Sequence, residues 1–240
     1  MIVTAHRGYS GQYPENTMPA FQKAAEFADE IEIDVQLSRD GRVMVFHDEN
    51  LERLTGNRAF LRDLDYNDLT KLNAAQCVYG DKFGFVPIPT LDEYFAWVKK
   101  TDIVTNIELK NGRFYYEGLE EKTIDLITKY DLAEKVYFSS FCHPSLIKCK
   151  KLNSKILCGV LAFAAIGNAG YYVRSSGLDF LHPEMKSLND ETVANCKNHG
   201  VGINVWTIDD MPGLIRAKNW NCRGVITDYP DICRAYAGGK

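Results

Sequence analysis

Short runs of apolar and β-branched residues alternate along the chain with longer stretches in which apolar residues recur at helical spacing. Eight such runs predict strands, at Ile2–Ala5, Ile31–Leu37, Ile103–Leu109, Val136–Phe141, Ile156–Ala162, Leu178–Leu181, Ile203–Ile208 and Gly224–Thr227. The stretches between them predict helices, most clearly at Leu91–Val98, Leu119–Tyr130, Ser145–Leu152, Asp190–Asn198 and Met211–Ala217. Strands that alternate with helices favour a parallel sheet, and eight repeats favour its closure into a (β/α)8 barrel, the TIM-barrel class of α/β fold.

The alternation is interrupted after the second predicted strand. Arg39-Asp40-Gly41 has turn chemistry, and Val43, Val45 and Phe46 then predict a further strand in a hairpin. The segment from about Glu49 to Pro89 is too long for an ordinary βα loop, which predicts a small insertion with a short helical stretch at Tyr66–Leu72. A second weak point is Phe163–Ser176, where Gly167 and Gly170 obscure the fifth helix.

Length and composition fit one soluble barrel. The 240 residues suffice for a single (β/α)8 domain over 1–240, and the chain is 45% hydrophobic and 25% charged. A net charge of −4 gives no electrostatic basis for binding nucleic acid. The N-terminus lacks a signal-peptide pattern, and no apolar run approaches the roughly 20 residues that span a bilayer. We therefore expect a cytoplasmic protein without stable membrane insertion; the sequence does not indicate its oligomeric state.

The seven cysteines predict no disulfide framework and no thiolate metal site. None of them is paired as CxxC, and several lie inside apolar runs, as Cys158 does. Buried, reduced thiols are the expected state.

Polar residues two apart mark the strands that carry the candidate chemistry. Glu32 and Asp34 alternate with Ile31, Ile33 and Val35 on the second strand, so that their side chains share one face, which must point into the barrel. The third strand repeats this arrangement with Glu108 and Lys110, and the seventh with Asn204 and Trp206. Active sites of such barrels lie at the carboxyl ends of the strands, where these residues belong.

Three inward carboxylates, Glu32, Asp34 and Glu108, cannot all be ionised close together without a counter-charge. A hard divalent cation, Mg2+ or Ca2+, is the natural partner of an all-oxygen site. The alternative is a buried salt-bridge network in which Arg7 and Lys110 neutralise the acids.

Two histidines follow strands at the same face of the barrel, His6 after the first strand and His47 after the hairpin. Because imidazole titrates near neutral pH, one can accept a proton while the other donates one. Arg7 and Lys110 suit the oxygens of a phosphate, and Trp206 either covers an alcohol group or fills the barrel mouth. His182 ends the sixth strand and is a weaker candidate, and we expect solvated roles for His143 and His199.

A series of short motifs resembles the signature of the glycerophosphodiester phosphodiesterases. The motifs run from residue 5 to about 231, and their order and spacing are specific although each alone is weak. They are His6-Arg7-Gly8, Pro14-Glu15-Asn16-Thr17, Glu32-Ile33-Asp34-Val35, His47-Asp48, Ile88-Pro89-Thr90-Leu91, Glu108-Leu109-Lys110, Ser140-Phe141, Val205-Trp206-Thr207 and Gly224-Val225-Ile226-Thr227-Asp228-Tyr229-Pro230.

The resemblance implies a barrel of the phospholipase-C-like phosphodiesterase type with a small insertion after its second strand. It implies that Glu32, Asp34 and Glu108 bind one divalent cation, Mg2+ or Ca2+, and that His6 and His47 are general acid and base. It also implies phosphate contacts from Arg7 and Lys110. Glu15 is expected near the site, while Asn16 is expected to cap the first helix.

The expected reaction is hydrolysis of a small glycerophosphodiester to glycerol 3-phosphate and an alcohol. A related phosphodiesterase acting on lysophospholipids is the alternative, which an apolar cavity mouth would favour; the sequence shows no long apolar loop at the strand ends. A glycosidase is disfavoured because its catalytic acids stand about 5–10 Å apart, whereas Glu32 and Asp34 share one strand face. A non-catalytic binding barrel does not explain two histidines beside three carboxylates.

Overall fold

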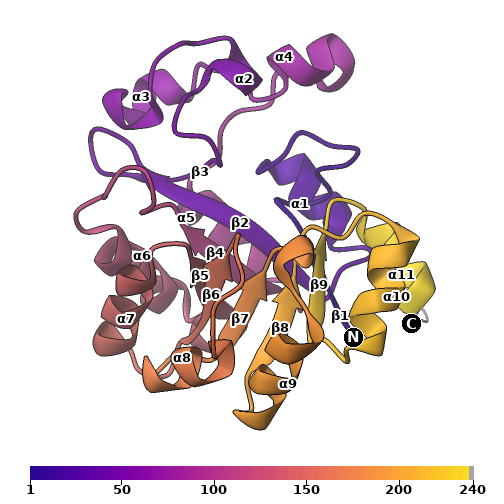
Figure 1. Cartoon of the computed structure of the whole chain (residues 1–240). Helices are drawn as coiled ribbons and strands as arrows, with labels where there is room; N and C mark the ends of the chain where they lie inside the picture. The colour runs from indigo at the N-terminus through magenta and orange to yellow at the C-terminus, as the bar shows by residue number, and fades with distance from the viewer. Residues whose placement is uncertain (238–240) are drawn as a thin grey trace.

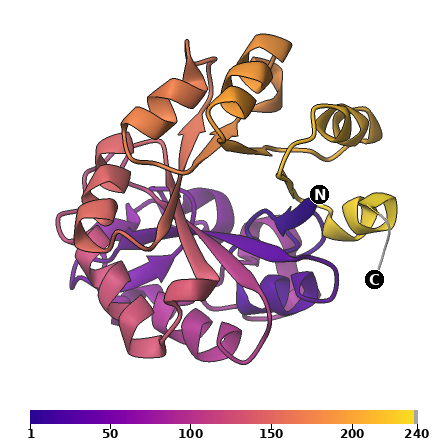
Figure 2. The same cartoon turned by 90° about the horizontal axis from the view of Figure 1, so that it is seen from below.

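Eight parallel strands close into a barrel in the computed structural model, which describes residues 1–237 (Figures 1 and 2). The strands are β1 (Ile2–Ala5), β2 (Glu30–Leu37), β4 (Val104–Leu109), β5 (Val136–Ser140), β6 (Leu157–Ala162), β7 (Phe180–Pro183), β8 (Gly202–Val205) and β9 (Gly224–Thr227). Each pairs with the next, and β1 closes the ring by pairing with both β2 and β9. The predicted (β/α)8 fold is confirmed.

Helices surround the barrel, as the view along its axis in Figure 2 shows. They are α1 (Met18–Ala24), α5 (Leu91–Val98), α6 (Leu119–Tyr130), α7 (His143–Leu152), α8 (Ala169–Ser175), α9 (Asp190–Asn198), α10 (Met211–Asn219) and α11 (Pro230–Ala237). Local sequence sets where several begin. Thr90 and Glu93 form a capping box at the start of α5, and prolines occupy the first turns of α7 and α10.

The two faces of β2 separate packing from chemistry. Ile31, Ile33 and Val35 are fully buried in the main apolar core between strands and helices. Residues in alternate positions point into the barrel, where Glu30 accepts hydrogen bonds from Tyr137 Oη (2.6 Å) and Arg223 Nη2 (2.8 Å). A buried carboxylate is tolerable there because it is both paired and hydrogen-bonded.

The insertion, residues 49–89, follows the short strand β3 (Val43–Val45), which pairs antiparallel with β2 as the hairpin pattern predicts. It contains α2 (Glu52–Thr55), α3 (Tyr66–Leu69), α4 (Gln76–Tyr79) and 3-10 turns at Leu61–Asp63 and Gly80–Phe83, and it lies above the barrel in Figure 1. A second, smaller apolar core, which the insertion shares with Met44 and Phe46 of the hairpin, holds it together; its other members are Leu51, Leu54, Leu61, Leu69, Ala74 and Ile88.

Several boundaries differ from the sequence prediction. The strand predicted at Leu178–Leu181 is β7, Phe180–Pro183, because the chain still turns at Leu178, whose N–H donates to the carbonyl of Val173. The strand predicted to continue to Ile208 ends at Val205. Five of the seven cysteines are buried as expected; Cys77 is exposed and Cys142 half-buried. Within residues 1–237, no helix is both long and apolar enough to cross a membrane.

Candidate active site

A cavity of about 250 Å³ opens at the carboxyl ends of the barrel strands. One side is polar and the other is apolar and largely aromatic. The lining residues are His6, Arg7, Glu32, His47, Asn106, Glu108, Ser139, Phe141, Leu161, Phe163, Trp206, Thr207 and Ile226. Most residues singled out from the sequence therefore meet in one cavity.

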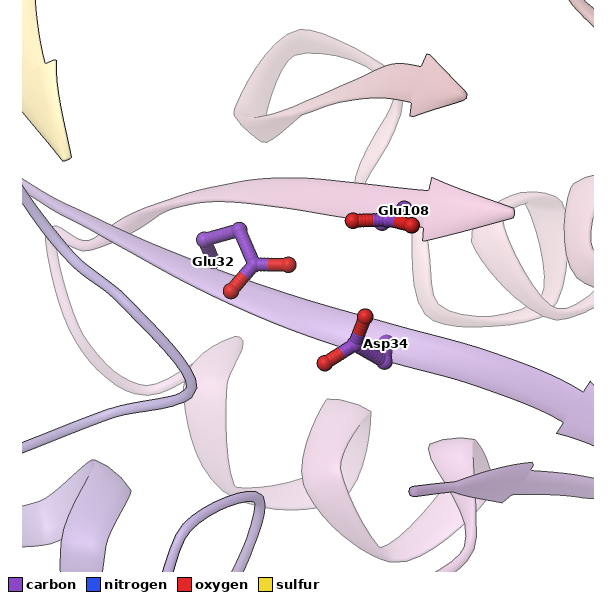
Figure 3. A group of neighbouring side chains, drawn as sticks. All are labelled: Glu32, Asp34 and Glu108. Atoms are coloured by element: carbon purple, nitrogen blue, oxygen red, sulfur yellow. The ribbon is translucent and has the colours of Figure 1, made fainter. Parts of the chain in front are cut away.

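Glu32, Asp34 and Glu108 form an acidic cluster on neighbouring strands β2 and β4 (Figure 3). One ligand oxygen from each lies within 4.8 Å of the others, because strand register sets Asp34 beside Glu108. Glu32 Oε1 and Asp34 Oδ1 are buried and accept no hydrogen bond from any described residue. Among residues 1–237, Glu32 Oε1 has no donor and Asp34 Oδ1 has the Lys110 ammonium 3.4 Å away, and buried carboxylate oxygens of this kind can bind a hard divalent cation.

Burial and neighbouring charges shift the pKa values of the two carboxylates on β2. Burial, and then the charges of Asp34 and Glu108, raise the pKa of Glu32 well above its usual range. Burial alone would also raise the pKa of Asp34, but His47, Lys110 and Arg7 together lower it. Two carboxylates on one strand face thus have opposed proton affinities, as expected for like charges that share a site.

His6 is held by an aspartate that directly follows the last barrel strand. Its Nδ1 lies 2.6 Å from Oδ1 of Asp228, which also accepts a hydrogen bond from Ser10 Oγ (2.9 Å). A carboxylate at Nδ1 favours the proton on that nitrogen, which leaves Nε2 as the basic atom. Asp228 follows β9, so the closure of the barrel brings it to His6 across 222 positions of sequence.

His47 is also held by an aspartate at Nδ1, but here the aspartate is its neighbour in the sequence. Its Nδ1 lies 2.7 Å from Oδ1 of the next residue, Asp48. Burial would raise the pKa of Asp48, but hydrogen bonds from His47 and Arg53 lower it, so the carboxylate stays ionised. The cavity is therefore lined by two imidazoles, each oriented by an aspartate.

The two cations predicted at the site differ in position. Arg7 lines the cavity, and its Nη1 donates to Glu15 Oε1 (2.9 Å), while its Nε lies 3.5 Å from Asp34 Oδ2. Lys110 is not among the lining residues; its Nζ pairs with Glu108 Oε1 (2.9 Å) and lies 3.4 Å from Asp34 Oδ1. Glu15 likewise is not among the lining residues, and it accepts a hydrogen bond from Arg7 of the cavity wall.

Asn16 does not cap the first helix, contrary to the expectation from the sequence. Its amide nitrogen donates to Asp34 Oδ2 (2.8 Å), and its amide oxygen accepts from the Asp34 backbone N–H (3.2 Å). The N-cap position of α1 belongs to Thr17. A left-handed backbone at Asn16, with φ of 54°, turns its side chain inward toward β2.

The remaining histidines lie outside the cavity lining. His182 is fully buried in the barrel, where Asn204 Nδ2 lies 2.9 Å from its Nε2. The expected solvated role of His143 is wrong, because its ring bridges the Tyr172 hydroxyl (2.7 Å) and the Leu161 carbonyl (3.0 Å). His199 is also tied down, through Nδ1 to the Asn195 carbonyl (2.8 Å).

Three aromatic side chains build the apolar side of the cavity. Phe141 and Phe163 stack with ring centroids 4.3 Å apart, and Trp206 packs edge-on at 5.8 and 5.3 Å from them. Phe163 is 63% exposed. The sequence pointed to Trp206 at the barrel mouth but not to Phe141 and Phe163 beside it, because each ring follows a different strand and no single loop is apolar. The signal in the sequence that could have identified this aromatic wall is one aromatic residue directly after each of three strands.

Two further polar residues face the cavity without being predicted. Asn106 and Ser139 are buried, line the cavity, and have side-chain atoms with no hydrogen-bond partner among residues 1–237: both amide atoms of Asn106 and the hydroxyl of Ser139. Asn106 is two residues before Glu108 on the same face of β4, and that spacing is the signal that could have identified it. Such groups are ready to bind hydroxyls.

Comparison with known proteins gives consistent matches. The model of the "Glycerophosphoryl diester phosphodiesterase family" matches residues 6–232. A glycerophosphodiester phosphodiesterase from Caldanaerobacter subterraneus subsp. tengcongensis is 39% identical over 96% of this chain and 95% of its own, and one from Bacillus altitudinis is 35% identical over 95% of each. A solved Oleispira antarctica phosphodiesterase, in complex with the product sn-glycerol-3-phosphate, has a TM-score of 0.88 and 29% identity over 99% of this chain and 96% of its own.

Proposed function

The chain belongs to the glycerophosphoryl diester phosphodiesterase family and is a phosphoric diester hydrolase, and on this premise we propose that it hydrolyses glycerophosphodiesters to glycerol 3-phosphate and an alcohol in a metal-dependent reaction. One observation carries the proposal: an acidic cluster and two aspartate-oriented histidines line a single cavity. The Oleispira relative with bound sn-glycerol-3-phosphate supports the same product.

Glu32, Asp34 and Glu108 would hold the cation, Mg2+ or Ca2+. When bound, such an ion supplies positive charge that polarises the phosphate and balances the three carboxylates. Arg7, which lines the cavity, would bind phosphate oxygens. Lys110 was also predicted to bind phosphate, but it does not line the cavity; through its ion pairs with Glu108 and Asp34 it would instead keep those carboxylates in position.

His6 and His47 would carry the proton transfers. One takes a proton from the attacking oxygen, which is either water or the substrate's own neighbouring hydroxyl. The other gives a proton to the alkoxide that leaves when the phosphorus–oxygen bond to the alcohol breaks. If the neighbouring hydroxyl attacks first, a cyclic phosphate forms and water then opens it to glycerol 3-phosphate. The polar side chains of Asn106 and Ser139 suit the glycerol hydroxyls, and Trp206 covers the organic part of the substrate.

A substrate panel tests this proposal. Glycerophosphocholine, glycerophosphoethanolamine and glycerophosphoglycerol would be incubated with chelated protein and then with added Mg2+, Ca2+ or Mn2+, with products followed by phosphorus NMR. We expect glycerol 3-phosphate from at least one diester, and only with added metal. Failure to cleave any diester under all three metals would contradict the proposed function.

A lysophospholipid substrate is a second candidate, favoured by the aromatic wall of Phe141, Phe163 and Trp206. An acyl chain requires an apolar surface at the cavity mouth. The ring of Phe163, which is 63% exposed, provides such a surface. Comparing kcat/KM for lysophosphatidylcholine and glycerophosphocholine separates the candidates. If the protein is a lysophospholipid phosphodiesterase, Phe163→Ala lowers kcat/KM for lysophosphatidylcholine and leaves kcat/KM for glycerophosphocholine unchanged.

A further inference from the structure

Arg53 connects the insertion to the cavity from outside it. It lies on α2, and its guanidinium contacts two carboxylates at once: Nε lies 2.6 Å from Asp48 Oδ2, while Nη1 and Nη2 lie 2.8 and 2.6 Å from the two oxygens of Glu15. The planar fork of an arginine can satisfy two carboxylates in fixed directions, which the single ammonium of lysine cannot do.

Each of these carboxylates holds a cavity residue. Asp48 binds Nδ1 of His47 at 2.7 Å, and Glu15 accepts a hydrogen bond from Arg7 Nη1 at 2.9 Å. Burial would raise the pKa of Glu15, but its contacts with Arg53 and Arg7 lower it, so the bridging carboxylate stays charged. Arg53 is therefore one carboxylate away from the proposed proton-transfer residue and from the proposed phosphate ligand.

The position of Arg53 is itself fixed. Its helix is held in the small apolar core by the buried side chains of Leu51 and Leu54, and Gly56, in a left-handed conformation, caps its C-terminal end. The Arg53 side chain is 45% exposed, whereas Glu15 is only 14% exposed. The guanidinium thus holds a mostly buried carboxylate through two parallel hydrogen bonds and a second carboxylate through a third, a fixed geometry that points to a positioning role.

We propose that Arg53 is a positioning residue, supplied by the insertion, that fixes the orientation of both His47 and Arg7 through Asp48 and Glu15. The inference deepens the proposed function and rests on it for its effect on turnover. It also gives the insertion a role in the active site, because the small apolar core holds the helix from which Arg53 contacts Asp48 and Glu15. No lining residue of the cavity comes from residues 49–89 themselves.

Kinetics of Arg53→Met and Arg53→Lys test the proposal, with Arg58→Met as the matched control. Arg58 belongs to the same insertion, but it is 87% exposed and pairs only with Glu52 (3.0 Å) among the described residues. We expect Arg53→Met to lower kcat on a glycerophosphodiester by about tenfold to 100-fold, as loss of an orienting partner does. Arg53→Lys should recover little of that loss, and Arg58→Met should stay within twofold of wild type.

A double-mutant cycle shows whether Arg53 acts through Asp48. If it does, Arg53→Met lowers kcat much less in an Asp48→Asn background than in wild type. Two results would overturn the proposal: full additivity of the two substitutions, or an Arg53→Met variant that melts at lower temperature but keeps kcat/KM within about threefold. If Arg53→Met does not fold, Arg53→Lys and Arg53→Gln carry the same comparison.

Nitrogen NMR of the His47 ring gives a readout that needs no turnover. Wild type should show one tautomer with the proton on Nδ1, and Arg53→Met should show a mixture, whereas Arg58→Met should match wild type. An unchanged ring signal in Arg53→Met overturns the positioning role. If wild type cleaves no glycerophosphodiester, the proposed function fails, and the ring signal still decides whether Arg53 orients His47.

Discussion

His6 and His47 have the same local chemistry although they reach the cavity by different routes. Each presents Nδ1 to an aspartate, at 2.6 Å from Asp228 and 2.7 Å from Asp48, so that Nε2 is the nitrogen left for proton transfer. A fixed tautomer removes the cost of reorienting the ring at each proton transfer. This pairing predicts how the two residues respond to substitution.

His6→Ala and His47→Ala should each lower kcat by roughly 100-fold or more, the usual contribution of a general acid or base. Both variants should fold, since neither ring belongs to the apolar cores. A nitrophenyl phosphodiester, whose leaving group needs no proton, should partly restore turnover only in the variant that lacks the acid. Near wild-type turnover of either variant on an alkyl diester would remove that histidine from the mechanism.

His182 is a buried histidine with a structural role. Burial, and then the charge of Arg223, lower its pKa to about 3. The folded state thus keeps the ring neutral, while the unfolded chain protonates it near pH 6.5. Above pH 6.5 both states keep the ring neutral, so its titration does not change the free energy of unfolding. As pH falls below 6.5 toward the folded-state pKa, the unfolded chain gains a proton that the folded state does not bind, and the free energy of unfolding decreases.

The free energy of unfolding measured between pH 8 and pH 5 tests this role of His182. We expect wild type to lose about 2 kcal/mol more over that interval than His182→Gln, which cannot titrate. Equal losses in the two proteins would mean that the folded state protonates His182 as readily as the unfolded chain does.

At the scale of single residues, the sequence predicted the acidic cluster and both histidines because strand alternation and strand ends alone place them. It did not predict the contact of Asp228 with His6 or of Arg53 with Glu15. Those contacts join segments 222 and 38 positions apart. They depend on how the barrel closes and how the insertion folds, which local periodicity does not encode.

Among the elements, the helix α8 was the hardest to predict, and its glycine explains why. Gly170 gives the sequence a weak helical pattern, yet it is where α8 packs directly on α9. A Cβ at this position would lie 2.5 Å from the backbone oxygen of Asn195. By contrast, α6 follows its predicted bounds at Leu119–Tyr130, because its apolar spacing is regular and uninterrupted.

Gly170→Ala should destabilise the protein by about 1–3 kcal/mol, the usual cost of overpacking. In an open helix the same change stabilises, by roughly 1 kcal/mol, so the sign of the effect is diagnostic. Gly167→Ala is the control, because a Cβ there meets nothing within 4 Å. Thermal unfolding of both variants decides the matter: a stabilised Gly170→Ala would show that α8 and α9 are not in close contact.

For the whole molecule, the barrel and the insertion contribute different residues to the proposed active site. Eight strands bring the acidic cluster and the aromatic wall to one opening, and the insertion adds the arginine that braces His47 and Arg7 from outside. The fold class could be predicted because eight strand–helix repeats have few other solutions. Within residues 49–89, the short helix predicted at Tyr66–Leu72 is confirmed as α3 (Tyr66–Leu69). The other helices could not be predicted, since they are only one turn long and the core is small.

The central claim is that Glu32, Asp34 and Glu108 hold a divalent cation on which hydrolysis depends. Its most direct test is a titration of chelated protein with Mg2+, Ca2+ and Mn2+, with ion binding and glycerophosphodiester cleavage measured in the same samples. We predict one ion bound per chain, with activity that rises in proportion to occupancy. Glu108→Gln should weaken binding at least about tenfold, and the exposed control Glu117→Gln should not. Full activity in exhaustively chelated protein, or ion binding unaffected by Glu108→Gln, would contradict this claim.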